Sequence, residues 1–294
     1  MITNNNLILN FKSRIGTFFC LAIIGLFLSG FFAQIITSFW GESTTTLRIS
    51  TVLQNVLFFI SPAIIIALYI TKLPADFLQL RLMPSLKSIL LTTFILIFSI
   101  PTMNFIIHCN ESVVFPDAFA GLENSLKALE ESSRAQIKIL LGEPTIGSLI
   151  MSILIIGVLT GLGEELFFRG ALQNIFRTRP MNHHYAIWIT AIIFSALHFQ
   201  FYGFIPRILI GAFFGYLIFW SGSIWLPIFA HVLNNSLVVI SSWISSRNTI
   251  NFDINKIATD FSTESYILII ISITTTSFLI TQLYRHFRAI SQPQ

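Results

Sequence analysis

Three ionisable side chains lie within six residues in the stretch 160–170, TGLGEELFFRG, inside an otherwise apolar part of the chain. They are Glu164, Glu165 and Arg169. A charged group at the depth of a lipid bilayer costs about 3 kcal/mol or more, so it normally faces a protein interior and has a role there. Carboxylates can accept protons or pair with a guanidinium, so this stretch is the first candidate for chemistry.

The spacing of the three groups separates them into a pair and a single carboxylate. On a helix, residues four apart share a face, so Glu165 and Arg169 are predicted to form an ion pair. Glu164 points about 100° away and has no local cation. A purely structural ion pair would account for Glu165 and Arg169 but leaves Glu164 unexplained. Gly157 and Gly161, one turn apart, are expected to let a neighbouring helix approach closely.

Two further apolar segments carry polar side chains. The segment FSALH places His198 four residues after Phe194, and HVLNN places Asn235 one helical turn after His231. Alone, a histidine in such a helix is more often a packing residue. Counted along each helix from its predicted cytoplasmic end, however, Glu164, His198 and Asn235 each lie about 20 Å deep. Polar groups from three helices are therefore predicted to share one layer of the membrane.

Composition places the chain among polytopic membrane proteins. Of its 294 residues, 54% are hydrophobic, 10% are charged and 30 are Phe. A soluble domain of this length would be about a quarter charged. The net charge of +4 does not indicate nucleic-acid binding, because the basic residues are spread along short loops. The sequence predicts an all-α fold, a membrane helix bundle with about eight transmembrane helices.

Eight apolar runs are long enough to be read as helical crossings. They are 15–39, 47–70, 86–107, 146–168, 185–199, 205–220, 224–243 and 266–283. The first run is long for a signal peptide and lacks an A-x-A cleavage site, so it is predicted to remain as a span. Nine bases then fall in the predicted cytoplasmic segments against one acid, Asp76, which places both termini in the cytoplasm. These bases are Lys12, Arg14, Lys72, Arg81, Lys87, Arg177, Arg179, Arg285 and Arg288.

The chain is predicted to form a single membrane domain, 1–294, with a core at 146–243 that carries the polar groups. The long loop 108–145 is predicted to be external. Leucines and isoleucines recur in it at roughly helical spacing among charged residues, which predicts an amphipathic helix. We interpret this helix as a solvated cap in preference to a substrate gate.

Three spaced motifs together resemble those of the CPBP family of intramembrane proteases, which includes CAAX prenyl endopeptidases and bacteriocin-processing and self-immunity proteins. The motifs are E-E-x-x-x-R at 164–169, F-x-x-x-H at 194–198 and H-x-x-x-N at 231–235. The resemblance covers about 146–243. It implies an endopeptidase of membrane-associated peptides or proteins, in a bacterial cell membrane, with the bilayer and the peptide substrate as partners and no nucleic acid.

The resemblance also implies roles for individual residues. Glu164 and His198 would activate a water molecule, while His231 and Asn235 would stabilise the oxyanion of the tetrahedral intermediate. Glu165, Arg169 and Phe194 would support them. The preferred mechanism needs no cofactor. Zinc held by Glu164, His198 and His231 is the alternative, because family members are often labelled metalloproteases, although the H-E-x-x-H spacing is absent.

Two other functions remain open at this stage. The chain could be a non-catalytic immunity or partner-binding protein that keeps the protease fold, in which case its function would survive loss of Glu164 and His198. It could instead be a transporter whose polar layer forms an ion path, although it lacks repeated half-sites. No feature of the sequence indicates an oligomeric state.

Overall fold

The computed structural model describes residues 11–177, 182–247 and 256–291, and Arg179, one of the predicted loop charges, lies outside them. The described chain is helical almost throughout, which confirms the predicted all-α class. Its elements in order are α1 (Phe11–Trp40), α2 (Thr44–Gln54), η1 (Asn55–Ile60), α3 (Ser61–Ile70), α4 (Pro74–Phe77), α5 (Leu86–Glu111), η2 (Asp117–Phe119), α6 (Ala120–Leu141), α7 (Ile146–Ser152), η3 (Ile153–Leu159), α8 (Thr160–Glu165), η4 (Leu166–Leu172), α9 (Gln173–Arg177), α10 (His183–Ala196), η5 (Phe201–Gly203), α11 (Phe204–Ser221), α12 (Trp225–Ser246) and α13 (Thr263–Ser291).

Several of these elements join end to end into longer rods. In two rods, Thr44–Ile70 and Ile146–Arg177, α-helical segments alternate with π-helical turns without a break. Within the described residues, seven helices are long and apolar enough to cross a membrane. They are Phe11–Trp40, Thr44–Ile70, Leu86–Glu111, Ile146–Arg177, Phe201–Ser221, Trp225–Ser246 and Thr263–Ile290. The protein is therefore a multi-pass membrane protein.

The fifth predicted crossing, 185–199, differs from the expectation. Its helix, α10, has 14 residues and ends at Ala196. At 1.5 Å per residue it is about 21 Å long, shorter than the roughly 30 Å of a bilayer core. The helix ends early because the backbone turns at Phe199, whose φ of 53° lies in the left-handed region. The described residues thus contain seven helices long and apolar enough to cross a membrane, together with the shorter α10, which packs against α11.

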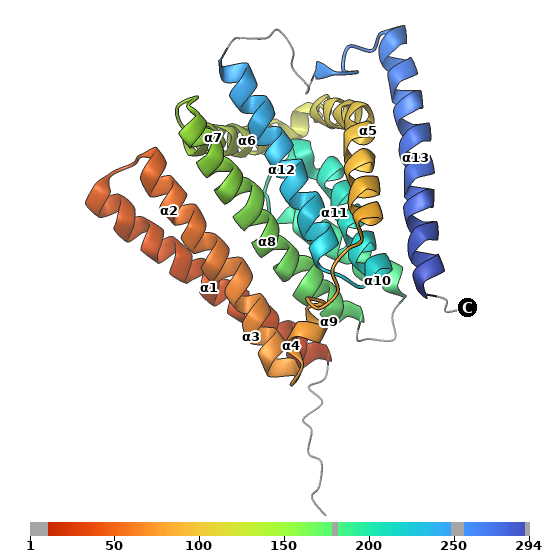
Figure 1. Cartoon of the computed structure of the whole chain (residues 1–294). Helices are drawn as coiled ribbons and strands as arrows, with labels where there is room; N and C mark the ends of the chain where they lie inside the picture. Colours follow the sequence, from red (N-terminus) through yellow and green to blue (C-terminus); the bar gives the residue numbers. More distant parts are fainter. Residues whose placement is uncertain (1–10, 178–181, 248–255, 292–294) are drawn as a thin grey trace, which may run out of the picture.

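Figure 1 shows α8 and α12 side by side at the centre of the bundle, α1 and α2 at one edge and α13 at the other. Glycines allow the central contact. A Cβ added at Gly161 would lie 3.2 Å from the backbone nitrogen of Val232 on α12, and one added at Gly157 would lie 2.7 Å from the hydroxyl of Ser236. The predicted close approach at these two glycines is confirmed, and it brings the rod Ile146–Arg177, which carries the first motif, against α12, which carries the third.

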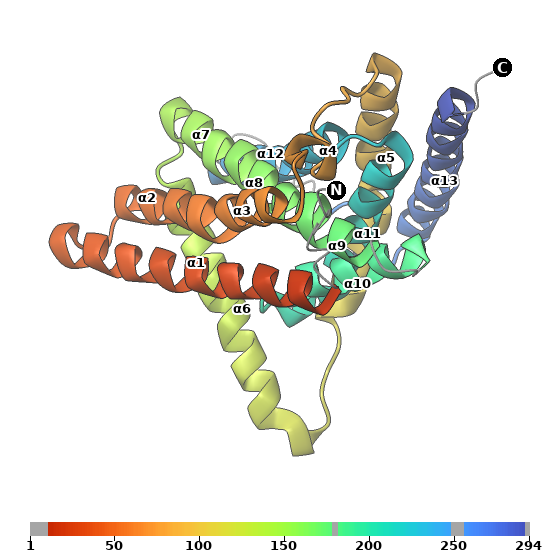
Figure 2. The same ribbon diagram turned by 90° about the horizontal axis from the view of Figure 1, so that it is seen from below.

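The segment predicted to be external forms α6, a 22-residue helix none of whose residues is buried. It lies across the end of the bundle where α7 begins and α12 ends (Figures 1 and 2). Arg48 of α2 holds its C-terminal end, because the guanidinium donates hydrogen bonds to the carbonyls of Leu140 and Leu141 at 3.1 and 3.0 Å. These bonds satisfy carbonyls that have no partner within the helix.

Candidate active site

The predicted ion pair between Glu165 and Arg169 is present and completely buried. The guanidinium donates a hydrogen bond of 2.7 Å to Glu165 Oε1 and a second of 2.9 Å to the carbonyl of Gly211 on α11, and both charged side chains are 0% exposed. Breaking a buried pair by removing one partner leaves an uncompensated charge, which is strongly destabilising. The pair therefore fixes η4 against α11.

Aromatic rings enclose the Arg169 guanidinium. Its carbon lies 4.6 Å from the ring centre of Phe194, 5.5 Å from that of Phe214 and 5.9 Å from that of Phe168. Ring faces carry partial negative charge, so they partly replace the water that the cation has lost. Phe194, expected to be a supporting residue, thus contacts Arg169 directly. Its backbone carbonyl also accepts a hydrogen bond from His198, the last residue of the second motif.

His231 of α12 joins the buried pair, which the sequence did not predict. Its Nδ1 lies 2.7 Å from Glu165 Oε1. Because a carboxylate only accepts hydrogen bonds, Nδ1 carries the proton and donates it. The other ring nitrogen, Nε2, is turned toward Glu164 and lies 3.8 Å from Glu164 Oε2. Glu165 therefore fixes the orientation of the imidazole as well as pairing with Arg169.

His198 lies just beyond the end of α10 and is oriented in a similar way. Its Nδ1 lies 2.8 Å from the carbonyl oxygen of Phe194, which can only accept, so Nδ1 donates here too. The Nε2 atoms of both imidazoles are then the ones that are free to act on another group. Both histidines thus carry their Nδ1 proton toward the protein.

Asn235 lies one turn after His231 on α12 and is held on both sides. Its amide nitrogen donates to the carbonyl of Ile156 in η3 at 3.1 Å, and its oxygen accepts from the side chain of Asn234 at 3.3 Å. An amide nitrogen has two hydrogens, and the bond to Ile156 uses one of them. The second hydrogen remains available as a donor.

One cavity brings the predicted residues together. It has a volume of about 420 Å³, and Glu164, His198, His231 and Asn235 all line it. Glu164 is 7% exposed and His231 4% exposed, so the cavity lies inside the protein and not on a lipid-facing surface. A carboxylate, two imidazoles and an amide can together accept a proton from water and donate hydrogen bonds to an oxyanion.

The cavity also contains polar residues that the sequence analysis did not select. Arg207 of α11 and Asn234 of α12 line it, together with Thr160 of α8. Arg207 is the basic residue of the run 205–220, and its position inside an apolar stretch was the available signal. Asn234 gave no signal, because it occupies one of the unspecified positions of the motif H-x-x-x-N.

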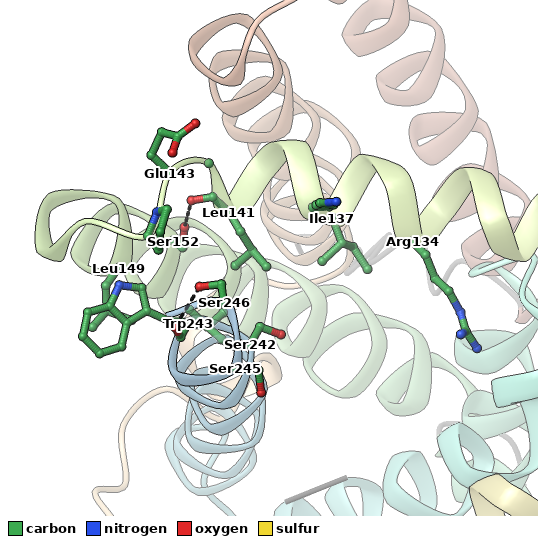
Figure 3. A pocket seen from close by; sticks show the side chains of 14 residues that line it. Arg134, Ile137, Leu141, Glu143, Leu149, Ser152, Ser242, Trp243, Ser245 and Ser246 are labelled. Carbon is green, nitrogen blue, oxygen red and sulfur yellow. Dashed lines mark hydrogen bonds between the residues drawn. The ribbon is translucent and has the colours of Figure 1, made fainter. Parts of the chain in front are cut away.

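Two neighbouring pockets share walls with this cavity. A groove of about 570 Å³ lies between the C-terminal end of α6, α7 and the end of α12, and it shares Ile137, Leu141, Val239 and Ser242 with the cavity. Figure 3 shows α6 on one side of this groove and Trp243 and the serines of α12 on the other. On another side, an apolar pocket of about 230 Å³ between α5, α11 and α12 shares Arg207, Ile210, Asn234 and Val238 with the cavity.

The zinc alternative requires Glu164, His198 and His231 to converge on one ion. Among the described residues, no group of three His, Cys, Asp or Glu side chains is placed so that it could hold a metal ion. The ring chemistry alone would suit a metal, because His231 Nδ1 is bonded to Glu165 and His198 Nδ1 to a backbone carbonyl, which leaves the Nε2 lone pair of each ring free. The side chains as placed do not fit a zinc ion.

Comparison with known proteins finds similar sequences for the central segment of the chain. Residues 146–237 match the family model for type II CAAX prenyl endopeptidase Rce1-like proteins. Over 88 residues, 29% of this chain, the sequence is 31% identical to the uncharacterized protein YpbD of Bacillus subtilis strain 168, and the alignment spans 42% of the length of that protein. No solved structure matches the chain. The matched segment runs from α7 into α12 and contains all three motifs, which confirms the predicted resemblance of this segment to the CPBP family.

Proposed function

We propose that the protein is an intramembrane endopeptidase that hydrolyses a peptide bond of a membrane-associated peptide or protein. The observation that carries this proposal is the convergence of Glu164, His198, His231 and Asn235, from three separate parts of the chain, on one buried cavity. The match to the family model of CAAX prenyl endopeptidases supports it. Hydrolysis needs a base, a water molecule and donors for the oxyanion, and the cavity provides the base and the donors.

Glu164 is the proposed general base. It takes a proton from a water molecule, and the water oxygen forms a bond to the carbonyl carbon of the substrate. His198 holds this water through Nε2, since its Nδ1 is bonded to the Phe194 carbonyl. The proton held by Glu164 then passes to the amide nitrogen, so the C–N bond breaks and an amine and a carboxylic acid are released.

His231 and Asn235 are the proposed oxyanion donors. For His231 to donate from Nε2, both ring nitrogens must carry a proton, and Glu165 and Glu164 lie on either side of the ring to balance that charge. Asn235 donates its second amide hydrogen. Such donors stabilise the negative charge that develops in the transition state, and each is typically worth about 10²–10³ in rate.

This mechanism needs no metal ion, and replacing Glu164 tests it. Purified Glu164→Gln protein should fold and insert as wild type does but lose cleavage by a factor of about 10²–10⁴, the usual contribution of a general base. Glu264→Gln, which makes the same change at an exposed position at the start of α13, is the matched control and should cleave normally.

The same assay with a chelator distinguishes the two mechanisms. Cleavage should be unchanged by the chelator if Glu164 works without a metal, whereas loss of cleavage and recovery on adding zinc would overturn the metal-free mechanism. Full cleavage by the Glu164→Gln protein would overturn the proposed function itself and would favour a non-catalytic immunity or partner-binding protein.

We also propose that the protein lies in a bacterial cell membrane with both termini in the cytoplasm. The support is the distribution of basic residues along the chain and the antiparallel arrangement of α10 and α11, in which His183 stacks on Phe219 at 4.0 Å. With α10 counted as a pass, the two termini fall on the same side. Protease access to a tag at each terminus, from one side of the membrane only, tests this orientation.

A further inference from the structure

Arg207 is a charged side chain in the catalytic cavity that the proposed mechanism does not use. It lies near the start of α11, within a helix long and apolar enough to cross the membrane. In the part of the chain that the structure describes, no carboxylate lies within ion-pair distance of its guanidinium. A charged side chain in a membrane-spanning helix that has no carboxylate partner normally has a functional role.

The guanidinium is held in place by the turn that precedes α11. It donates to the backbone carbonyl of Gln200 at 3.1 Å and to the side-chain oxygen of Gln200 at 2.7 Å. It also lies against Gly203, where an added Cβ would collide with it. A guanidinium has five N–H donors in a rigid plane, so three remain beyond the two that Gln200 accepts.

Two carboxylates act on Arg207 electrostatically without forming an ion pair with it. They are Glu164 in the cavity and Glu130 on α6. Glu130 Oε1 lies 3.5 Å from the Arg134 side chain, and its Oε2 is buried and has no hydrogen-bond partner. Neither carboxylate therefore satisfies the remaining donors of Arg207.

The location of Arg207 connects it to substrate binding. It lines both the catalytic cavity and the apolar pocket of about 230 Å³ beside it. A peptide lying across Glu164 that reached Arg207 could place an apolar side chain in this pocket. The planar guanidinium matches the geometry of a carboxylate, with which it forms two parallel hydrogen bonds.

We propose that Arg207 is a specificity-determining residue that binds a carboxylate of the substrate and thereby sets where the peptide lies relative to Glu164. This inference rests on the proposed function. The carboxylate comes from one of two sources, the C-terminus of the peptide or an acidic side chain. The competing explanation is that Arg207 only balances the charge of Glu164, and it predicts that all substrates depend on Arg207 equally.

Matched peptides test the proposal. A peptide mixture from a digested bacterial proteome, incubated with the purified full-length protein, identifies a cleaved sequence by mass spectrometry. That sequence is then made in three forms: with a free C-terminus, with a C-terminal amide, and with its acidic side chains changed to amides. Two of the three forms lack a carboxylate. Wild-type protein should cleave one of these two with a kcat/KM about 10- to 100-fold lower than that of the unmodified peptide, the usual range for a hydrogen bond to a charged group. Which form is affected identifies the source.

Arg207→Gln should remove this preference, lowering kcat/KM for the carboxylate form to the value for the amide form and leaving the amide form unchanged. Arg207→Lys should restore part of the preference, because it keeps the charge but not the planar geometry. Gly203→Ala should also weaken it, since the added methyl group displaces the guanidinium without changing its charge. Arg247→Gln, at the exposed end of α12, is the control and should keep the preference. An equal loss on both peptide forms in Arg207→Gln would overturn the proposal.

Binding separates this proposal from the proposed function. A peptide that immobilised Glu164→Gln protein retains from the same mixture is made in free-acid and amide forms, and the Kd of each form for the Glu164→Gln protein is measured with and without the Arg207→Gln change. A preference for the carboxylate that depends on Arg207 supports the inference even if wild-type protein cleaves no peptide. Equal Kd values for both forms overturn it even if cleavage depends on Glu164.

Discussion

Glu164 and Glu165 are adjacent residues of α8, yet they belong to two different regions of the molecule. Glu165 lies in a sealed region in which Arg169, His231 Nδ1 and the surrounding aromatic rings occupy the space around it. Glu164 lies in the cavity, where the nearest basic side chain is His231, whose Nε2 is 3.8 Å from Glu164 Oε2. In the sealed region charges are paired and hold the helices together, whereas the proposed mechanism needs the polar groups of the cavity to keep positions open for water and substrate.

The comparison shows how one helix can build a rigid support and a reactive site side by side. Adjacent residues point about 100° apart, so a single turn presents one carboxylate to each region. His231 connects the two regions, because its Nδ1 faces the sealed pair and its Nε2 faces the cavity. The position of the reactive nitrogen therefore depends on the ion pair behind it.

The largest expected effect is on the sealed region. Arg169→Met should lower the free energy of unfolding by about 3–5 kcal/mol, because it leaves Glu165 as a buried charge with only His231 beside it. The measurement is thermal unfolding of the purified protein in detergent. Wild-type stability in this variant would show that the sealed pair is not structural.

A double variant sharpens the comparison. Arg169→Met with Glu165→Leu removes both charges, and exchanging a whole buried pair for apolar residues of similar size is often neutral or stabilising. The double variant should therefore recover stability but not cleavage, since His231 Nδ1 has lost the carboxylate that orients it. Recovery of both would mean that Glu165 has no part in positioning His231.

The sequence predicted the features that depend on local spacing and failed on those that depend on long-range contacts. The pairing of Glu165 with Arg169 follows from the four-residue spacing, and the close packing of α8 on α12 follows from Gly157 and Gly161. The bond between Glu165 and His231 joins residues 66 positions apart, and nothing in the spacing of either motif indicates it.

Two other differences between the sequence-based prediction and the structure also have physical causes. Hydropathy counts apolar residues but not backbone turns, so it could not place the end of α10 at Ala196. Arg207 is the third residue of the run 205–220, where a single base looks like a boundary charge and does not predict a cavity residue. In the structure Gln200 and the turn before α11 hold this side chain in the cavity.

The second-largest expected effect is a loss of catalytic rate when a side chain of the cavity is changed. Asn235→Ala should lower kcat by about 10²–10³ with little change in KM, as expected for a donor that acts only in the transition state. Asn234→Ala is the matched control: its side chain lines the same cavity but donates to Asn235, so it should have a clearly smaller effect. Equal losses in the two variants, or a change in KM alone, would remove Asn235 from the proposed oxyanion site.

The smallest expected effect comes from a single methyl group at the boundary of the two regions. In Gly211→Ala, the new Cβ would lie 3.1 Å from the Phe194 ring and 3.3 Å from Arg169 Nη2, while the Gly211 carbonyl still accepts from the guanidinium. Such overpacking typically costs about 1–3 kcal/mol. Gly30→Ala, on α1 with open space around it, is the matched control and should be neutral or slightly stabilising, because alanine favours a helix.

Two measurements on the Gly211→Ala protein, its thermal unfolding and its rate of cleavage, show how closely the sealed region and the cavity are coupled. If the ion pair positions His231, the displaced guanidinium should lower cleavage by more than the fall in the folded fraction explains. Cleavage that falls only in proportion to the folded fraction would mean that the cavity tolerates movement in the sealed region. The rigid support would then end at the Glu165–Arg169 pair, and the proposed coupling through His231 would be wrong.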